Sequence, residues 1–407
     1  MKTIAIIGGG ASGIMAAIAA AKTGKDTEIL LLEHKDKIGK KILSTGNGRC
    51  NLTNAYMDIS CFRGESKDEI ETVLSAFGYE DTLRLFEEMG LMTKSRNGYI
   101  YPRCDQAAAV LEILCMELRK YKVQIITEAH VTAVMRGKKG FRIEAGKEVY
   151  RADRVILSAG SKAAPVLGSD GSGYGLAKSL GHTMIPVVPA LVQLRSEKHS
   201  LHKASGVRTE ACVSALVDES CVCEDRGELQ ITAYGISGIP VFQISRYIAK
   251  ALYNGQKAEV AIDFFPELDE NAFFLLLKRQ FSDRKEQEAA SCLTGLFAHK
   301  LIPVLFSEAG IHMHAKAKEI TDKQLKRLTQ TCKYMKIQIK DTNGFENAQV
   351  CAGGVNLTEI DCHTMQSRYV DGLYLTGELL DVDGICGGYN LQWAWATGYI
   401  AGSHAAK

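Results

Sequence analysis

The sequence lacks several features that would indicate particular classes of protein. It has no apolar run long enough to cross a bilayer and no CxxC pair among its 12 cysteines. Its 49 basic and 47 acidic residues leave a net charge of only +2. The absence of adjacent thiols argues against a disulfide reductase, and the absence of a basic run argues against nucleic-acid binding on electrostatic grounds. The scattered thiols indicate a reducing cytoplasm, and we expect no membrane association.

The length and composition are those of a globular protein with more than one domain. The chain has 407 residues, of which 46% are hydrophobic and 24% charged. A single core rarely grows to this size, so two or three domains are expected. No internal repeat is visible.

The first 33 residues follow the pattern of a dinucleotide-binding unit. Residues 3–7 form a continuous apolar and β-branched run, residues 14–22 favour a helix, and residues 26–32 form a second strand. Lys2 before apolar residues also resembles the start of a signal peptide. The apolar run is too short for one, however, and glycines follow it, so we expect a strand.

The sequence GGGASG at residues 8–13 lies between the first strand and the helix. Gly8 permits a tight turn, Gly10 lets a pyrophosphate approach the backbone, and Gly13 lets helix and strand pack closely. Glu33, at the end of the second strand, can accept hydrogen bonds from a ribose. The alternative is a glycine-rich turn that binds nothing. The motif alone does not distinguish FAD from NAD.

Four further segments favour a flavin. Residues 40–54 are rich in Gly, Asn and Ser and could wrap a polyanionic ligand, with a surface loop as the alternative. Residues 154–160 form a buried strand ending in the small residues Ala159 and Gly160. Residues 372–378 form another strand, which ends in Gly377 and Glu378.

The fourth segment, residues 384–398, reads GICGGYNLQWAWATG. The pair Gly387 and Gly388 interrupts the chain, and residues 389–397 then favour a helix. Its N-terminus would favour negative charge on a reduced flavin ring. The two tryptophans are expected to be packing residues.

Together these motifs resemble the BaiN-like, or aminoacetone-oxidase-like, family of bacterial flavoproteins, also called the YhiN family. The resemblance rests on GGGASG (8–13), KKILSTGNGRCNLTN (40–54), YPRCDQAAAV (101–110), GSDGSGYGLAKSLGH (168–182) and TGELLDVDGICGGYNLQWAWATG (376–398). The sequence departs from the family pattern at Thr45, where Gly is usual, and at residues 231–234, where ITAY replaces an FTH-type sequence.

The resemblance implies non-covalent FAD and a set of residues around it. Carried over by position, the residues at the pyrophosphate are Gly8, Gly10, Ala11, Ser12 and Gly13, with Glu33 at the adenosine ribose and Val131 beside the adenine, in a strand expected from His130. Those between pyrophosphate and flavin are Lys41, Ser44, Gly46, Asn47, Arg49, Cys50 and Asn51. Gly377 and Glu378 would hold the ribityl chain, and Asn390 and Leu391 would lie near the ring.

We expect an α/β fold with a Rossmann-like, two-dinucleotide-binding FAD domain that is discontinuous. Its parts are residues 1–190 and 345–407, because the flavin segments occupy the two ends of the chain. Residues 191–265 and 331–344 are expected to form an inserted β domain with short strands over 192–264. Residues 266–330 are expected to form a small helical domain.

The sequence offers candidates for the catalytic proton donor. Tyr389 and Cys386 are candidate proton donors because they flank the flavin-facing glycines, although packing roles are the simpler interpretation. Tyr234 and His182 are further candidates, and His182 could instead complement a helix end. His312 and His314 have no partner at metal-ligand spacing, so no metal is expected.

The family resemblance implies a small-molecule substrate and leaves two reactions open. The first, which we favour, is reduction of an activated C=C bond in a steroid-type enone of the bile-acid kind. The second is oxidation of a small amine, as with aminoacetone, by oxygen. No second GxGxxG unit is present, so NAD(P)H would bind transiently as an electron donor. A flavoprotein acting on tRNA and a non-catalytic flavin-binding protein are more distant alternatives, and no nucleic-acid partner is expected. The oligomeric state is left open.

Overall fold

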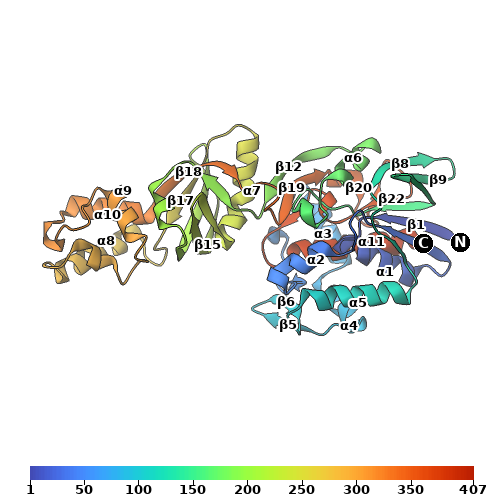
Figure 1. The fold of residues 1–407 in the computed structure, drawn as a ribbon, viewed down its shortest axis with the longest axis horizontal. Helices are drawn as coiled ribbons and strands as arrows, with labels where there is room; N and C mark the ends of the chain where they lie inside the picture. Colours follow the sequence, from blue (N-terminus) through green and yellow to red (C-terminus); the bar gives the residue numbers. More distant parts are fainter. The chain divides into compact units, whose positions relative to one another are not determined.

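The computed structural model describes residues 1–407, which form two compact units (Figure 1). The first unit joins the two ends of the chain, Met1–Val187 and Gln349–Lys407, and the second is Val188–Ala348. No helix is both long enough and apolar enough to span a membrane. The predicted α/β fold class with a parallel Rossmann-like sheet is confirmed.

The core of the first unit is a seven-stranded sheet with the order β20-β21-β22-β11-β1-β2-β7. The strands β22, β11, β1, β2 and β7 are parallel, whereas β20 and β21 add antiparallel pairs at one edge. Their bounds are β1 Lys2–Ile7, β2 Thr27–Leu32, β7 Gln124–Ile126, β11 Arg154–Leu157, β20 Ile360–Asp361, β21 Gln366–Ser367 and β22 Leu373–Leu375. β1 is apolar throughout its C-terminal half because helices cover both faces of such a sheet.

The register of the parallel strands brings four distant segments to one edge. Ile7 lies opposite both Leu32 and Leu157, and Leu157 lies opposite Leu375. The carboxyl ends of parallel strands form the usual ligand crevice of an open α/β sheet. The turns that follow these strands therefore meet there, although they come from both ends of the chain.

Two helices beside this sheet pack backbone to backbone against each other. They are α1 (Ala11–Thr23) and α11 (Tyr389–Ala406). A Cβ atom on Gly398 would lie 2.3 Å from the Ser12 carbonyl oxygen, and one on Gly402 would lie 2.1 Å from the Ala16 carbonyl oxygen. The helices approach this closely because glycine occupies both contact points. Figure 1 shows both helices beside the sheet near the two termini.

The remaining elements of the first unit cover or extend the sheet. The helices are α2 Lys40–Ser44, α3 Lys67–Ala76, α4 Tyr79–Glu88, α5 Ala107–Lys120 and α6 Ser172–Ser179, with short 3-10 turns that include η1 Thr45–Gly48 and η8 Gly377–Leu379. The small sheets contain β8 Val131–Gly137, β9 Gly140–Ala145 and β10 Glu148–Ala152; β3 Thr53–Asn54, β5 Thr93–Arg96 and β6 Tyr99–Pro102; β4 Phe62–Arg63 and β23 Asp383–Gly384; and β12 Met184–Ala190 with β19 Val350–Val355. The last three residues of β12 belong to the second unit.

The second unit is a closed six-stranded barrel with four helices. The barrel order is β13-β16-β15-β14-β17-β18, and closure removes the sheet edges that would otherwise be exposed. The strands are β13 Leu194–Ser196, β14 Arg208–Val217, β15 Ser220–Thr232, β16 Gly235–Gly238, β17 Ala258–Asp263 and β18 Met335–Thr342, and the helices are α7 Ile239–Tyr253, α8 Glu270–Asp283, α9 Ile302–Ala309 and α10 Asp322–Lys333.

One expectation for this unit is wrong. Residues 192–264 are not short strands throughout, because α7 forms a 15-residue helix within them. Pro240 occupies its first turn, where proline is tolerated, and the buried residues Val241, Ile244 and Ile248 recur at helical spacing. The Ile and Val residues on either side of this helix are typical of strands, and they hide the helical period in the sequence.

The contact between α1 and α11 gives a prediction about stability. Replacing Gly402 with Ala places a methyl group against a backbone carbonyl that cannot move aside. We expect the free energy of unfolding to fall by about 1–3 kcal/mol, as for other overpacked sites. Gly175→Ala is the matched control, because the space around that α6 glycine is open and Ala raises helix stability by about 0.5–1 kcal/mol. Chemical denaturation measures both. Equal stabilities for the two variants would contradict the packing account.

Candidate cofactor site

The turn after β1 needs glycine at two positions. Gly8 has φ +108°, and a Cβ atom there would lie 2.4 Å from the Ser158 carbonyl oxygen. A Cβ atom on Gly13 would lie 1.9 Å from the Gly8 carbonyl oxygen. The backbone of the turn thus packs against both the helix that follows it and the strand beside it. The sequence assigned Gly8 and Gly13 these roles in turn formation and close packing.

Gly10 has a different environment, with no protein atom within 4 Å of the position of a Cβ atom. It precedes α1 and caps it without a side-chain hydrogen bond, and the first turn of α1 contains no acidic residue. The first amide groups of this helix, at Ala11, Ser12 and Gly13, therefore lack partners within the helix. Free N–H groups and the positive end of the helix dipole favour an anion at this point.

Glu33 lies beside the glycine turn and is only 8% exposed. Its Oε2 accepts a hydrogen bond of 2.8 Å from the Gly9 amide, and its Oε1 accepts one of 2.8 Å from the Lys35 amide. The two bonds fix the carboxylate at the end of β2. Each oxygen retains a lone pair that can accept a further hydrogen bond.

Histidines that the sequence analysis did not select lie near Glu33. His34 Nδ1 is 3.3 Å from Glu33 Oε1, and the rings of His34 and His130 meet edge to face at 5.8 Å. Nε2 of His34 is buried without a hydrogen-bond partner, and Asp170 Oδ2 lies 3.9 Å from it. Val131, the predicted adenine neighbour, is 6% exposed and begins β8. The sequence could have indicated His34, because it directly follows Glu33.

A half-buried ion pair joins the N-terminal and C-terminal parts of the chain. Lys41 Nζ lies 2.7 Å from Glu378 Oε2, and the Ser161 hydroxyl donates a bond of 2.9 Å to the same oxygen. Both charged side chains are less than a quarter exposed. These contacts orient Glu378 and use only one of its oxygens. Sequence reasoning selected Lys41 and Glu378 but missed Ser161.

The pair is held by a turn that also needs glycine. Gly377 has φ +67°, and a Cβ atom there would lie 2.5 Å from the Ser12 hydroxyl oxygen. The Gly377 amide donates to the Thr397 hydroxyl at 2.9 Å, and the Trp393 indole donates to the Gly377 carbonyl at 3.1 Å. The turn η8 is therefore fixed between α1 and α11.

The loop after α2 contributes the remaining predicted cofactor residues. Gly46 and Asn47 have φ of 56° and 54°, so the loop is left-handed there. Cys50 is buried, and burial raises the pKa of its thiol to about 11, so the thiol is protonated at neutral pH. Oδ1 of Asn51 is buried and has no hydrogen-bond partner in the protein. A bound N–H or O–H group would satisfy this oxygen.

Other predicted positions have local structural partners. The Ser44 hydroxyl donates to the Lys41 carbonyl at 2.9 Å, and Arg49 Nε donates to the Gly46 carbonyl at 3.3 Å. Gly160 has φ +73°. Ala159 packs closely on α6, because a Cβ atom on Gly173 would lie only 2.7 Å from the Cβ atom of Ala159. These contacts shape the loops around the crevice.

The segment before and within the first turn of α11 is tightly packed. Asn390 uses its whole amide on Gly384, accepting from its N–H at 2.8 Å and donating to its C=O at 2.9 Å. Leu391 is half-buried. Tyr389 is 3% exposed and meets Phe62 edge to face, and burial, followed by the neighbouring Cys61, raises the pKa of its hydroxyl. This environment favours the packing role for Tyr389. Cys386 is half-buried.

His182 belongs to a buried network. Its Nδ1 lies 2.8 Å from Glu359 Oε2, and its Nε2 lies 2.9 Å from the Ser367 hydroxyl. Burial by itself raises the pKa of Glu359, but hydrogen bonds from Thr183 and His182 outweigh it and leave the pKa below its usual value. Both ring nitrogens of His182 are thus engaged, which favours a structural role. In the second unit, Tyr234 lies beneath Arg195, whose Cζ is 5.3 Å from the ring centroid.

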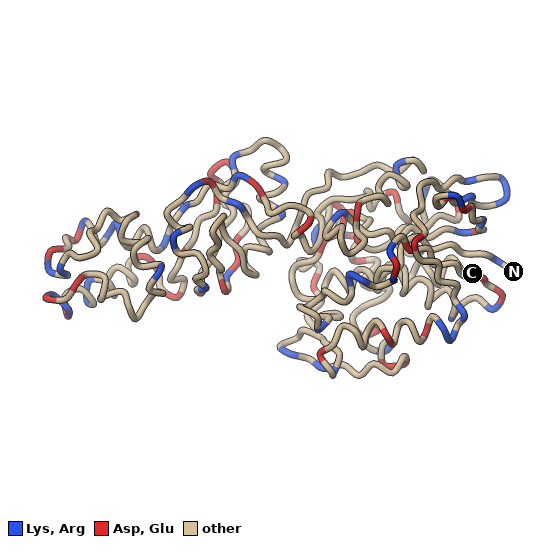
Figure 2. Tube along the Cα trace, in the orientation of Figure 1, with Lys and Arg blue, Asp and Glu red and all other residues tan.

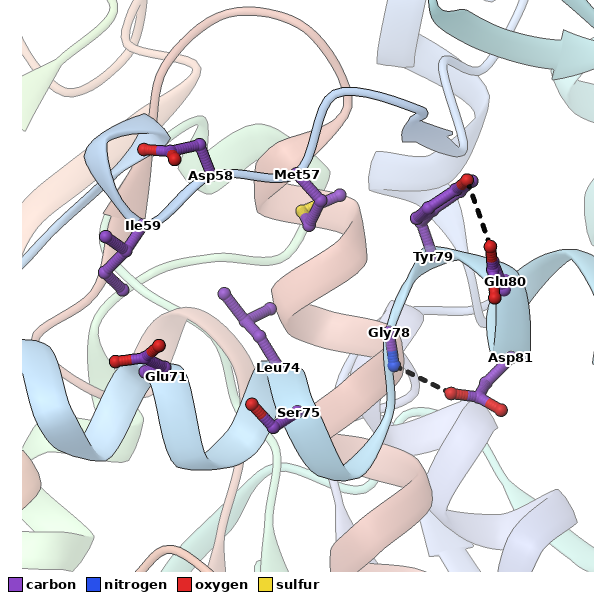
Figure 3. A pocket seen from close by; sticks show the side chains of 10 residues that line it. All are labelled: Met57, Asp58, Ile59, Glu71, Leu74, Ser75, Gly78, Tyr79, Glu80 and Asp81. Atoms are coloured by element: carbon purple, nitrogen blue, oxygen red, sulfur yellow. Dashed lines mark hydrogen bonds between the residues drawn. The ribbon is translucent and has the colours of Figure 1, made fainter.

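A separate pocket of about 420 Å³ lies between α3, α4 and the loop before α3. Figure 3 shows its lining, in which four carboxylates (Asp58, Glu71, Glu80 and Asp81) surround the apolar side chains of Met57, Ile59 and Leu74. None of the predicted cofactor residues lines it. Four like charges disfavour an anionic ligand such as a pyrophosphate, so this pocket is not the dinucleotide site.

Comparison with known sequences gives matches along nearly the whole chain. A family model described as HI0933-like protein Rossmann domain matches residues 2–404. The 3-dehydro-bile acid delta(4,6)-reductase of Clostridium scindens is 57% identical over 411 residues, covering 100% of both chains. The ribosomal RNA dihydrouridine synthase of Haemophilus influenzae is 31% identical over 97% of this chain and 96% of that protein. The enzyme of the same name from Escherichia coli is 28% identical over 97% of this chain and 95% of that protein.

Solved structures of flavoenzymes share the fold. The 3-ketosteroid delta1-dehydrogenase of Sterolibacterium denitrificans has a TM-score of 0.51 with 12% identity and coverage of 100% of both chains. The FrdA subunit of Escherichia coli quinol fumarate reductase has a TM-score of 0.50 with 15% identity, covering 100% of this chain and 70% of that one. At these identities the likeness concerns the fold alone.

The different surroundings of Gly10 and Gly13 give a prediction about FAD binding. A methyl group at position 10 meets no protein atom but occupies the approach of a pyrophosphate, so Gly10→Ala folds normally and binds FAD at least about tenfold more weakly, a loss of roughly 1.4 kcal/mol. Gly13→Ala unfolds more easily, because its methyl group meets a backbone oxygen. Fluorescence titration with FAD and thermal unfolding of the apoprotein separate the two effects. Unchanged FAD affinity in a folded Gly10→Ala protein would contradict this placement of the pyrophosphate.

Proposed function

The chain belongs to the family described as HI0933-like protein Rossmann domain, and on this basis we propose that it is an FAD-dependent reductase. The proposed substrate is a steroid of the bile-acid type in which a C=C bond is conjugated to a ketone. The observation that carries the proposal is the 57% identity, over the full length of both chains, with a 3-dehydro-bile acid delta(4,6)-reductase.

The reactions for which these relatives are named share one type of chemistry. The bile-acid enzyme is named for reducing double bonds conjugated to an oxidised C3, and dihydrouridine is uridine in which the C=C bond conjugated to a carbonyl is reduced. Both reactions add a hydride to the electron-poor end of the double bond and a proton to the other end. When bound, FAD would act as a two-electron carrier that accepts hydride from a nicotinamide and delivers it through N5.

The pyrophosphate of FAD fits the N-terminus of α1. This end has unpartnered amides at Ala11, Ser12 and Gly13, no acidic residue in its first turn, and open space at Gly10. The amides would donate to the phosphate oxygens, and the dipole of a 13-residue helix would favour their charge. Glu33 would accept hydrogen bonds from the adenosine ribose, as acidic residues at this position do.

The ribityl chain fits the turn η8. Lys41 and Ser161 hold Oε2 of Glu378, which leaves Oε1 to accept from a hydroxyl group. The buried Oδ1 of Asn51 is an acceptor that requires a partner. A hydroxyl-rich or N–H-bearing ligand supplies such donors. We therefore assign these side chains, with Gly46, Asn47 and Arg49, to the path from ribityl to ring.

The flavin ring is proposed to lie at the N-terminus of α11. Gly388 caps this 18-residue helix without a side-chain bond, and its first turn has no acidic residue. The free amides at this end would favour negative charge on the reduced ring. Cys386 remains the candidate proton donor from the sequence, since Tyr389 is packed in the core.

The inserted segments are proposed to act as separate domains. Residues 191–265 and 331–344 would constitute one β domain and residues 266–330 a helical domain, with residues 1–190 and 345–407 binding FAD. NAD(P)H is proposed as a transient electron donor, because the chain has a single GxGxxG unit for a dinucleotide. The scattered free thiols fit a cytoplasmic location.

Ribosomal RNA is a second candidate substrate. It is supported by two dihydrouridine synthases that are 28% and 31% identical over 97% of this chain. The lower identity and the net charge of +2 favour the small molecule, because RNA binding depends strongly on cationic contacts to phosphate.

An anaerobic reduction assay tests the proposed function. The FAD-bound protein is mixed with NADH or NADPH and a 3-oxo-4,6-diene bile acid, and we expect the dienone absorbance to disappear. Mass spectrometry then shows a product heavier by the added hydrogen atoms. Consumption of nicotinamide without loss of the dienone would contradict the proposal.

Two parallel reactions separate the alternatives. Unmodified ribosomal RNA, assayed for dihydrouridine, tests the second candidate. Aminoacetone with oxygen, assayed for peroxide, tests amine oxidation. The Gly10→Ala protein provides the control for dependence on FAD, because we expect it to fold normally but to bind the pyrophosphate of FAD more weakly.

A further inference from the structure

Cationic side chains gather around one aromatic ring on the β5–β6 hairpin. The guanidinium carbon of Arg49 lies 5.5 Å from the centroid of the Tyr101 ring, and that of Arg96 lies 5.7 Å from it. Lys94 and Arg96 both pair with Oδ2 of Asp105, with the Arg96 NH2 group at 2.7 Å. We refer to these five residues as the Tyr101 cluster.

The Tyr101 cluster has an excess of positive charge. It contains the three cations Lys94, Arg96 and Arg49 and a single carboxylate. Hydrogen bonding from Lys94, aided by the charges of Arg96 and Arg49, outweighs burial and lowers the pKa of Asp105, so this carboxylate is ionised at neutral pH. Arg96 is 48% exposed. The cluster therefore presents net positive charge to solvent while one carboxylate holds two of its cations in place.

The hairpin that carries the Tyr101 cluster adjoins both segments assigned to the flavin ring. A Cβ atom on Gly46 would lie 3.7 Å from Tyr101 Cε1, and one on Gly387 would lie 3.1 Å from Tyr99 Cε1. β6 also pairs with β3, which follows the loop containing Arg49. Figure 2 marks Lys and Arg on this hairpin, at the lower edge of the first unit. A molecule over the proposed ring position would have the hairpin as a neighbour.

We propose that Arg96 and Lys94 bind the oxyanion of the molecule that exchanges hydride with the flavin, beside Arg49 of the cofactor loop. The inference rests on the proposed function. The oxyanion is the side-chain carboxylate of a bile-acid-type substrate or a phosphate of the nicotinamide donor. Guanidinium groups match both because their planar donors form paired hydrogen bonds with carboxylate or phosphate oxygens. The Tyr101 ring supports the two guanidinium groups through cation–π contact.

The arrangement gives the cluster a role in specificity. Asp105 is a positioning residue, since it holds Lys94 and Arg96 but repels an anionic ligand itself. An uncharged analogue gains nothing from these two cations. The Tyr101 cluster therefore discriminates a ligand with a free acid group from the same ligand as an ester.

The test measures binding to the FAD-bound protein, so that it does not depend on turnover. The double variant Lys94→Gln/Arg96→Gln is compared with Arg84→Gln, an exposed arginine on α4 that pairs only with Asp81. Calorimetry gives dissociation constants for the 3-oxo-4,6-diene bile acid, for its methyl ester, and for NADH and NADPH. Thermal unfolding confirms that both variants are folded.

If the substrate carboxylate is the ligand, the double variant binds the acid about tenfold or more weakly and the ester as the wild type does. If a nicotinamide phosphate is the ligand, affinity for the nucleotide falls instead. The inference is overturned if the double variant binds every ligand as tightly as Arg84→Gln does. It is also overturned if the wild-type protein does not prefer the acid over its ester and the double variant binds the nucleotides as the wild type does. Weakened binding of an RNA oligonucleotide alone would assign the cluster to RNA and also overturn it.

Turnover is measured separately. A wild-type protein that prefers the acid and loses this preference in the double variant, but does not reduce the dienone, contradicts the proposed function while supporting the oxyanion site. A protein that reduces acid and ester equally well, in the wild type and the double variant alike, supports the function and contradicts the site.

Discussion

The first unit depends on close backbone contact around the N-terminal turn of α1. Gly13 faces the Gly8 carbonyl, Gly398 faces the Ser12 carbonyl, and Gly377 faces the Ser12 hydroxyl, each at a distance that leaves no room for a Cβ atom. The strand turn, the C-terminal helix and the turn η8 therefore converge on two residues of one helix. This packing places segments more than 360 residues apart in sequence at the same carboxyl edge of the sheet.

The candidate site follows from that convergence. Because η8 is fixed beside α1, Glu378 reaches Lys41 from the other end of the chain and the two form an ion pair at 2.7 Å. The N-terminus of α1 without a side-chain cap, the fixed carboxylate of Glu33 and the unpartnered oxygen of Asn51 lie in the same unit. Their chemistry suits phosphates, a ribose and a polar ring system respectively, which are the parts of FAD.

The sequence predicted the local elements well because their signals are local. The strand–glycine–helix unit, the second strand ending before Glu33 and the helix after Gly388 were found from periodicity and glycine spacing, although α11 continues to Ala406 rather than residue 397. Ser161 and Thr397 were missed, since only the folded chain brings them to Glu378 and Gly377. Helix α7 was mistaken for strands because its Ile and Val residues suit both structures. The family resemblance, which rested on long motifs, is confirmed.

Amide hydrogen exchange with and without FAD tests most directly whether the two chain ends form one cofactor site. We expect FAD to slow exchange together at residues 8–13 and 377–378, because both segments adjoin the N-terminus of α1 and would be covered by the pyrophosphate and ribityl groups. Protection confined to one end of the chain, or to residues 188–348 alone, would contradict the account.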